Sequence, residues 1–132
     1  MEKYITRDDY LIAKGVDLEL ELQDDDNPSR KVERLIEEIT DWCVEHLTKN
    51  YQGGIDLLDF DKLSEIRQKY FRKGVIEQIE YVLRNGFTNK DSGYNSETGV
   101  IVDLSKIALS PNAKQKFWMG GFANICQVKR RW

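Results

Sequence analysis

The sequence is poor in residues that form cross-links or bind soft metals. Its 132 residues include two cysteines and one histidine. A structural zinc site takes about four nitrogen or sulfur ligands, so the composition argues against one. The two cysteines, Cys43 and Cys126, are not expected to pair, because disulfides are rare in reducing compartments. Only two prolines are present, Pro28 and Pro111, and both stand where a helix is expected to begin.

Long apolar runs are missing as well. A membrane-spanning helix needs about 18 or more consecutive apolar residues, and the sequence contains no such run. Residues 1–9 lack the apolar stretch of a secretory signal peptide, so we expect no membrane partner. The chain has 132 residues, 40% of them hydrophobic, with no internal repeat and no dividing linker. It is therefore expected to form a single domain over residues 1–132.

Charge is unevenly distributed although the net charge is only −3. Residues 1–60 carry sixteen Asp or Glu and seven Lys or Arg, a net charge of −9. Residues 61–132 carry seven Asp or Glu and thirteen Lys or Arg, a net charge of +6. Two interpretations fit: two solvated faces of opposite sign, or a subunit whose acidic flank meets the basic flank of an identical neighbour. A head-to-tail contact of the second kind closes into a ring.

The beginning of the chain predicts a short helix and then a strand. Thr6 and Asp9 have the spacing of a capping pair, and Gly15 is placed to end the helix. Residues 16–22 alternate apolar and polar side chains, which is the periodicity of a β-strand. A strand needs a partner for its backbone groups, and residues 100–102 are the expected partner in this chain.

Two long amphipathic helices follow. Acidic residues before Pro28 indicate the start of the first helix, which is expected to run to about Asn50. After a turn with paired glycines, the second helix is expected from Asp59 to Asn85. Gly74 lies inside it, which indicates either a close approach by another helix or a kink. The expected buried residues are Val32, Leu35, Ile36, Ile39, Trp42, Cys43 and Leu47 in the first helix, and Leu63, Ile66, Tyr70, Phe71, Val75, Ile79, Val82 and Leu83 in the second.

A last helix begins with Ser110 as its cap and Pro111 at its first position. It is apolar on nearly all sides and is interrupted by paired glycines. Its adjacent Phe117 and Trp118 must point in directions roughly 100° apart. A helix of this kind is either central to a core or sandwiched between subunits.

The expected fold class follows from these elements. It is mainly α, a small helical bundle of about four helices with a minor β element near residues 16–22 and 100–102. Residues 87–99 are rich in Gly, Asn, Ser and Thr and predict a loop.

No group of residues points to catalysis, so we expect no enzyme, no cofactor and no bound metal. Cys43 and His46 lie one turn apart on the first long helix, but the sequence suggests no oxyanion hole and no third residue to orient them. The acidic runs at Asp24–Asp26 and Asp56–Asp61 lack the pattern of a calcium loop and suit helix starts. The glycine pairs lack the lysine and Ser or Thr of a phosphate-binding loop.

The C-terminal tail, residues 126–132, combines three cations with an aromatic residue. Three interpretations are open: a solvated terminus, an anchor on another protein, or a contact with nucleic-acid phosphates. Arg and Trp are the residue types that dominate interface hot spots. The candidate protein-interaction residues are Phe117, Trp118, Phe122, Lys129, Arg130, Arg131 and Trp132.

The order of the elements and two local motifs resemble a family of viral assembly proteins. The first motif is Gln78-Ile79-Glu80-Tyr81 followed by Asn85-Gly86, and the second is Ser110-Pro111 with Ala113, ahead of a helix with aromatic residues and paired glycines. In these features the chain resembles the head–tail connector proteins of long-tailed bacteriophages, also called adaptor or head-completion proteins. The stretch over residues 16–26 departs from the family pattern.

The resemblance implies a structural virion protein without enzymatic activity. Such proteins are small helical bundles that form a ring below the portal and continue the DNA channel. The implied partners are the portal protein, a tail-side stopper or completion protein, and further copies of the chain in a ring expected to be twelve-fold. DNA would pass without specific binding, and the chain would be assembled into the virion in the host cytoplasm. The last helix and Lys129–Trp132 would face the portal.

Two other functions fit the residues. One is a small cytoplasmic protein-interaction module or regulator. The other is a DNA-binding protein that uses the basic second half of the chain, which predicts an affinity that falls steeply with salt.

Overall fold

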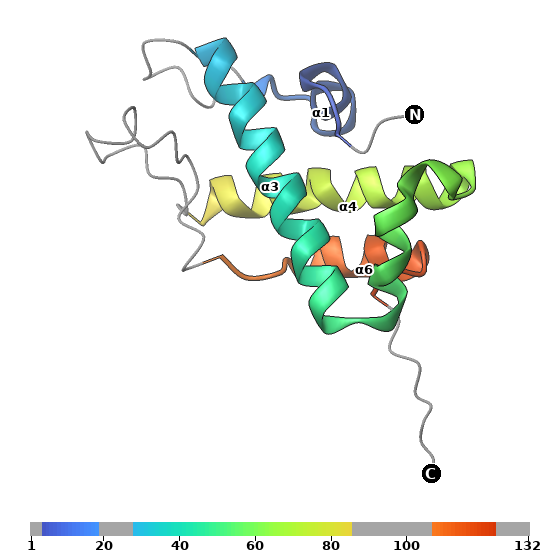
Figure 1. Cartoon of the computed structure of the whole chain (residues 1–132). Coiled ribbons are helices and arrows are strands. Elements are labelled where there is room, and N and C mark those ends of the chain that lie inside the picture. The colour runs from blue at the N-terminus through green and yellow to red at the C-terminus, as the bar shows by residue number, and fades with distance from the viewer. Residues whose placement is uncertain (1–3, 19–27, 86–106, 124–132) are drawn as a thin grey trace.

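The computed structural model describes residues 4–18, 28–85 and 107–123. They form α1 (Arg7–Lys14), α3 (Pro28–Asn50), the 3-10 helix η1 (Gln52–Lys62), α4 (Glu65–Arg84) and α6 (Pro111–Met119). In Figure 1, α3 crosses in front of α4, while α1 lies above α4 and α6 lies below it. The prediction of a mainly α bundle with about four helices is confirmed.

Helix α1 begins and ends where the local sequence predicts. Thr6 Oγ1 accepts a hydrogen bond from the backbone N–H of Asp9, and the Asp9 carboxylate accepts one from the N–H of Thr6. Gly15 follows with a φ of 74°, in the left-handed region that favours glycine. Lys14 holds α1 on α4, because its ammonium group lies 2.8 Å from the Glu77 carboxylate.

The predicted strand over residues 16–22 is wrong where the structure describes it. Residues 16 and 17 have no regular structure, and Leu18 is helical. Leu18 is fully buried whereas Val16 is 39% exposed, so the two do not share one face as they would in a strand. The Arg7 guanidinium donates two hydrogen bonds to the Asp17 carboxylate. This ion pair connects residue 17 to α1, and the next residue, Leu18, packs in the core.

The described residues contain no strand and no helix that is long and apolar enough to cross a membrane. Several predicted features lie outside these residues and stay predictions: residues 19–22, the acidic run Asp24–Asp26, the loop 87–99, the strand 100–102 and the tail 126–132.

Helix α4 begins later than predicted. Residues 52–62 form η1, inside which Asp59 has non-helical φ and ψ of −121° and 56°. The α4 cap is Ser64, whose side chain accepts a hydrogen bond from a backbone N–H in the first turn. The buried Gln68 donates to the carbonyl oxygen of Phe60 and holds the junction together. The expected burial of Ile66 is wrong, since this residue is 62% exposed on the first turn of α4.

Gly74 allows α6 to lie directly on α4. A Cβ atom at Gly74 would lie 2.5 Å from Cδ1 and 2.7 Å from Cζ of Phe117, far inside van der Waals contact. Of the two predictions for this glycine, the close approach by another helix is therefore the correct one. The predicted start of α6 is also confirmed, because Pro111 is its first residue and Ser110 is its cap.

All five elements contribute to one apolar core. The buried stripe of α3 matches the prediction, except that Trp42 is only partly buried. The centre of the core is aromatic, with the ring of Phe71 packed edge-on against Phe60 at a centroid distance of 5.5 Å. The other buried apolar side chains of α4, η1 and α6 are Val75, Ile76, Ile79, Val82, Leu57, Ala113 and Phe117.

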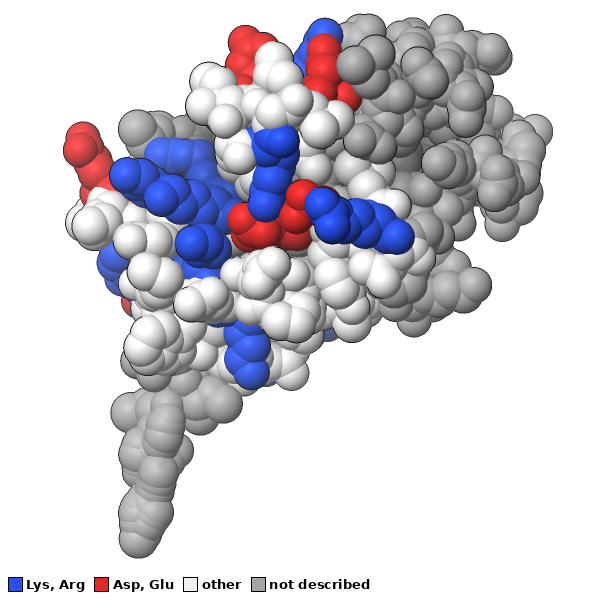
Figure 2. All heavy atoms as spheres, turned by 180° about the vertical axis from the view of Figure 1, so that it is seen from behind, with Lys and Arg blue, Asp and Glu red and all other residues white. Residues whose placement is uncertain are grey.

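Charged side chains are unevenly distributed over the surface. Glu33, Glu37, Asp41 and Glu45 are exposed on α3, the helix in front in Figure 1. Figure 2 shows the opposite side of the molecule, where Lys and Arg side chains gather on the left part of the described surface. Asp and Glu side chains lie on the same face as these cations, at its centre and upper edge.

Candidate protein-interaction site

Helix α6 separates the predicted interaction residues into buried and exposed ones. Phe117 and Phe122 are fully buried, and their rings lie 5.6 and 5.9 Å from that of Phe71. They are core residues of the folded chain and offer no surface to a partner. Trp118 and Met119 are 63% and 46% exposed. The predicted divergence of the two adjacent aromatic residues is confirmed.

Phe122 is buried because the chain reverses after α6. Gly121 has a φ of 84°, which an L side chain rarely adopts. This turn lets the N–H of Phe122 donate to the carbonyl oxygen of Phe117 at 2.8 Å. Of the seven candidate residues, Trp118 is the one that the structure places at the surface. Lys129, Arg130, Arg131 and Trp132 lie outside the described residues, and their role stays a prediction.

Gln78 joins the two sequence motifs. Its side chain is fully buried, Nε2 donates to the carbonyl oxygen of Ala108 at 2.8 Å, and Oε1 accepts from the N–H of Ser110 at 2.8 Å. Burying an amide costs free energy unless its polar atoms are paired, and here both are. Gln78 thereby fixes the point where α6 begins. The sequence signal for this role is a polar residue on the apolar side of α4, three positions after Val75.

Arg67 holds the other end of α6. Its Nε donates to the carbonyl oxygen of Gly120 at 2.8 Å, and its Nη2 lies 2.8 Å from Oδ2 of Asp56. The guanidinium also lies over the ring of Phe122, 4.8 Å from its centroid. One side chain of α4 therefore connects η1 with the turn that follows α6. Sequence reasoning missed Arg67, because its partners are far apart along the chain.

Cys43 and His46 do not have the properties of a nucleophile and its base. Cys43 is fully buried, and burial raises the pKa of its thiol far above the ordinary value, which disfavours the reactive thiolate. The His46 ring stacks on Trp42 with centroids 4.7 Å apart. Burial lowers the pKa of His46. Both residues act in packing, as an inert buried thiol and a neutral aromatic ring.

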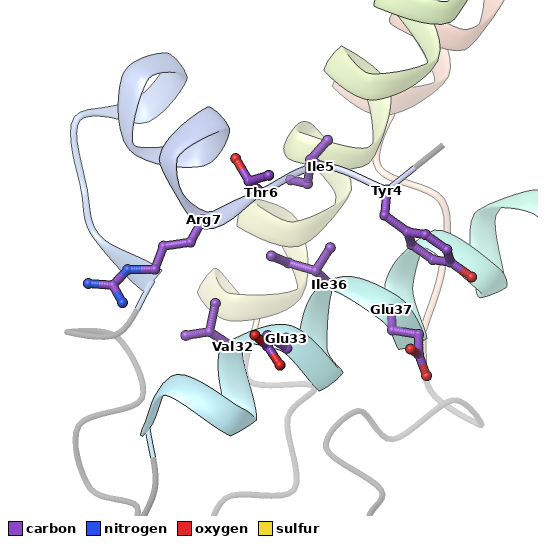
Figure 3. A pocket seen from close by; sticks show the side chains of 8 residues that line it. All are labelled: Tyr4, Ile5, Thr6, Arg7, Val32, Glu33, Ile36 and Glu37. Atoms are coloured by element: carbon purple, nitrogen blue, oxygen red, sulfur yellow. The ribbon is translucent and has the colours of Figure 1, made fainter. Parts of the chain in front are cut away.

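A pocket of about 430 Å³ opens between the segment before α1 and helix α3 (Figure 3). The Tyr4 hydroxyl donates to Asp41 at 2.7 Å, and this bond raises the pKa of Tyr4 to about 12. Thr6 is engaged in its cap and Arg7 pairs with Asp17. In Figure 3, Tyr4 and Arg7 point away from each other, so these polar groups do not converge on a ligand. The lining residues are Tyr4, Ile5, Thr6, Arg7, Val32, Glu33, Ile36 and Glu37.

Metal-binding geometry is not found in the parts of the chain that the structure describes, where no three His, Cys, Asp or Glu residues come together. Comparisons of the chain with protein-family models, with curated proteins and with solved structures found no match. The resemblance to head–tail connectors therefore stays a prediction that the sequence motifs carry.

Proposed function

We propose that this chain is a structural assembly protein, a head–tail connector of a long-tailed bacteriophage. It binds a portal ring through the end of α6 and the residues that follow, and it works by protein contacts without catalysis. The observation that carries the proposal is the pair of exposed apolar side chains, Trp118 and Met119, on a helix that α4 holds at both ends.

The support for a docking role is the rigidity of this helix. Gln78 sets where α6 begins and Arg67 holds the turn where it ends. A side chain that is already positioned loses less conformational entropy when a partner binds. Trp is also the residue type that most often contributes a hot spot. Trp118 therefore combines the chemistry of an anchor with a preorganised support.

The two motifs behind the resemblance give further support. They are separated along the sequence but meet in the bridge from Gln78 to Ser110. Both motifs thus serve one purpose, the placement of α6. In the proposed assembly, copies of the chain form a twelve-fold ring between the portal and a tail-side stopper, and DNA passes through the ring without specific binding.

The proposal is tested by binding of the purified chain to the portal ring encoded in the same gene cluster. We expect Trp118→Ala to weaken binding by about thirtyfold, the effect of losing one hot spot. Deleting residues 126–132 is expected to weaken it further. The matched control is Ile12→Ala on α1, where the side chain is 83% exposed and the affinity should not change.

Two outcomes would contradict the proposal. The first is a wild-type chain that does not bind the portal at any salt concentration. The second is a chain that carries both Trp118→Ala and the deletion and still binds with full affinity.

The basic face in Figure 2 favours a second function, the binding of DNA. Lys69 and Lys73 are exposed on α4 and could contact phosphates. Glu77 and Glu80 lie on the same helix and are engaged by Lys14, which reduces the positive potential nearby. A DNA affinity that falls steeply between 50 and 200 mM salt, as expected for about six phosphate contacts, would favour this function over the connector.

A further inference from the structure

An acidic ridge runs along the solvent side of α3. It consists of Glu33, Glu37, Asp41 and Glu45, which follow each other at four-residue intervals and are all exposed. Four-residue spacing places side chains on one side of a helix. At a rise of about 1.5 Å per residue, the ridge extends over roughly 18 Å. The ridge borders the segment before α1, because Glu33 and Glu37 line the pocket in Figure 3 and Asp41 accepts a hydrogen bond from Tyr4.

A basic patch lies on the first half of α4. It consists of Lys69, Arg72 and Lys73, whose spacing of three and four residues groups them on one side of the helix. Lys69 and Lys73 are exposed, and the Lys73 ammonium lies 5.3 Å from the centroid of the Tyr70 ring. Ile66, one turn earlier, adds an apolar side chain that is 62% exposed. Figure 2 shows that Lys and Arg side chains gather on the side of the molecule opposite to the view of Figure 1.

The ridge lies on α3, which is in front of α4 in Figure 1, and Figure 2 shows that Lys and Arg side chains gather on the opposite side of the molecule. Complementary charge on opposite faces is the arrangement that a repeated head-to-tail contact requires, and such contacts close into rings. Opposite charges across an interface also set its register and speed its formation.

We propose that the acidic ridge of one copy contacts the basic patch of the next copy. This inference rests on the proposed function and names the surfaces through which the ring forms. The partner of the basic patch is a second copy of this chain, because the four carboxylates of the ridge carry the opposite charge.

The contact is tested directly by zero-length cross-linking with a carbodiimide, which joins a carboxylate and an amine as an amide with loss of water. Mixing ¹⁵N-labelled and unlabelled protein distinguishes links between copies from links within one copy. We expect mixed-isotope links from Glu33, Glu37, Asp41 or Glu45 to Lys69 or Lys73. Their absence in concentrated wild-type protein at low salt would overturn the proposal.

Charge reversal gives a second test. One variant carries Glu33→Lys with Glu37→Lys, and the other carries Lys69→Glu with Lys73→Glu. With Glu33→Lys and Glu37→Lys, the links from Asp41 or Glu45 to Lys69 or Lys73 should fall about tenfold, because attractive exposed pairs become repulsive. The variant with Lys69→Glu and Lys73→Glu has lost both reactive amines, so by itself it should form none of these links. An equimolar mixture of the two variants should recover the links, since each reversed surface then meets a surface of opposite sign.

Two further variants serve as controls. Asp8→Lys on α1 and Lys114→Glu on α6 reverse exposed charges outside both surfaces and should leave the link yield unchanged. Equal losses in these controls would contradict the inference, as would a mixture that stays at the level of its components. Circular dichroism of each variant confirms the helical fold before the comparison.

Failure of this inference is distinguishable from failure of the proposed function. If the reversed variants assemble on the portal as the wild type does, the ridge-to-patch contact is wrong while the connector function stands. If the cross-links form but the portal does not bind, the contact stands and the connector function is wrong. If Lys69→Glu with Lys73→Glu abolishes binding of duplex DNA, and Glu33→Lys with Glu37→Lys leaves the links from Asp41 or Glu45 to Lys69 or Lys73 unchanged, the patch serves nucleic acid and the inference is overturned.

Discussion

Replacing Gly74 by alanine measures how closely α6 lies on α4. Alanine has the higher helix propensity, which is worth about 1 kcal/mol in favour of the variant. The new methyl group would lie 2.5 Å from Cδ1 and 2.7 Å from Cζ of Phe117, whereas carbon atoms in contact are about 3.5–4.0 Å apart. The ring must therefore move by about 1 Å. It is fully buried against Phe71, so it cannot move freely.

The expected net effect of Gly74→Ala is a loss of about 2 kcal/mol in the free energy of unfolding. Overpacking a core costs about 1–3 kcal/mol, and the displacement of a buried ring belongs at the upper end of this range. The gain in helix propensity offsets about 1 kcal/mol of it. Urea denaturation followed by far-UV circular dichroism measures the difference.

The same substitution should change sign when Phe117 is alanine. The obstructing ring is then absent, and Gly74→Ala should stabilise the chain by about 1 kcal/mol through helix propensity alone. The coupling free energy between the two sites is therefore expected to be about 3 kcal/mol. Phe117→Ala alone costs about 3–5 kcal/mol, which domains of ordinary stability can tolerate. Equal effects of Gly74→Ala in both backgrounds would refute the close packing of α6 on α4.

Three other substitutions give independent checks. Thr40 is fully buried, and its hydroxyl has no hydrogen-bond partner among the described residues. Thr40→Val should therefore increase the free energy of unfolding, measured by urea denaturation, by about 1 kcal/mol. A decrease would mean that the hydroxyl is paired. Gln78→Ala should cost about 1–3 kcal/mol, because it leaves the buried N–H of Ser110 unpaired and also removes the hydrogen bond to the carbonyl oxygen of Ala108, whereas the exposed Gln115→Ala should be nearly neutral. Burial lowers the pKa of His46 below its ordinary value, so the unfolded chain takes up the proton first. Stability should then fall as the pH drops from about 7 through the folded pKa, and His46→Gln should flatten the pH dependence of the urea midpoint.

The candidate site was only partly predictable from the sequence. The divergence of Phe117 and Trp118 follows from helix geometry alone, and it correctly separates a core residue from a surface residue. The burial of Phe122 does not follow in the same way, because it depends on the left-handed turn at Gly121. The hydrogen bonds of Arg67 were also not predictable, because its partners, Asp56 and Gly120, are 11 and 53 residues away from it in the sequence.

Features that depend on neighbouring residues are what the sequence by itself determined. The capping pair of Thr6 and Asp9, the proline and serine at the start of α6, and the apolar stripe of α3 each depend on residues within a few positions of one another. Each is a pattern within one segment, so residue spacing predicts it.

Only the tertiary structure decided the remaining features. The alternation after Gly15 suggested a strand, but Leu18 enters the core and the Arg7–Asp17 pair holds its segment. The helix expected from Asp59 starts at Glu65, because η1 packs on α3 and Gln68 closes the junction. In each case a contact between segments outweighed a local preference of about 1 kcal/mol or less, and no pattern within one segment records which other segment will face it.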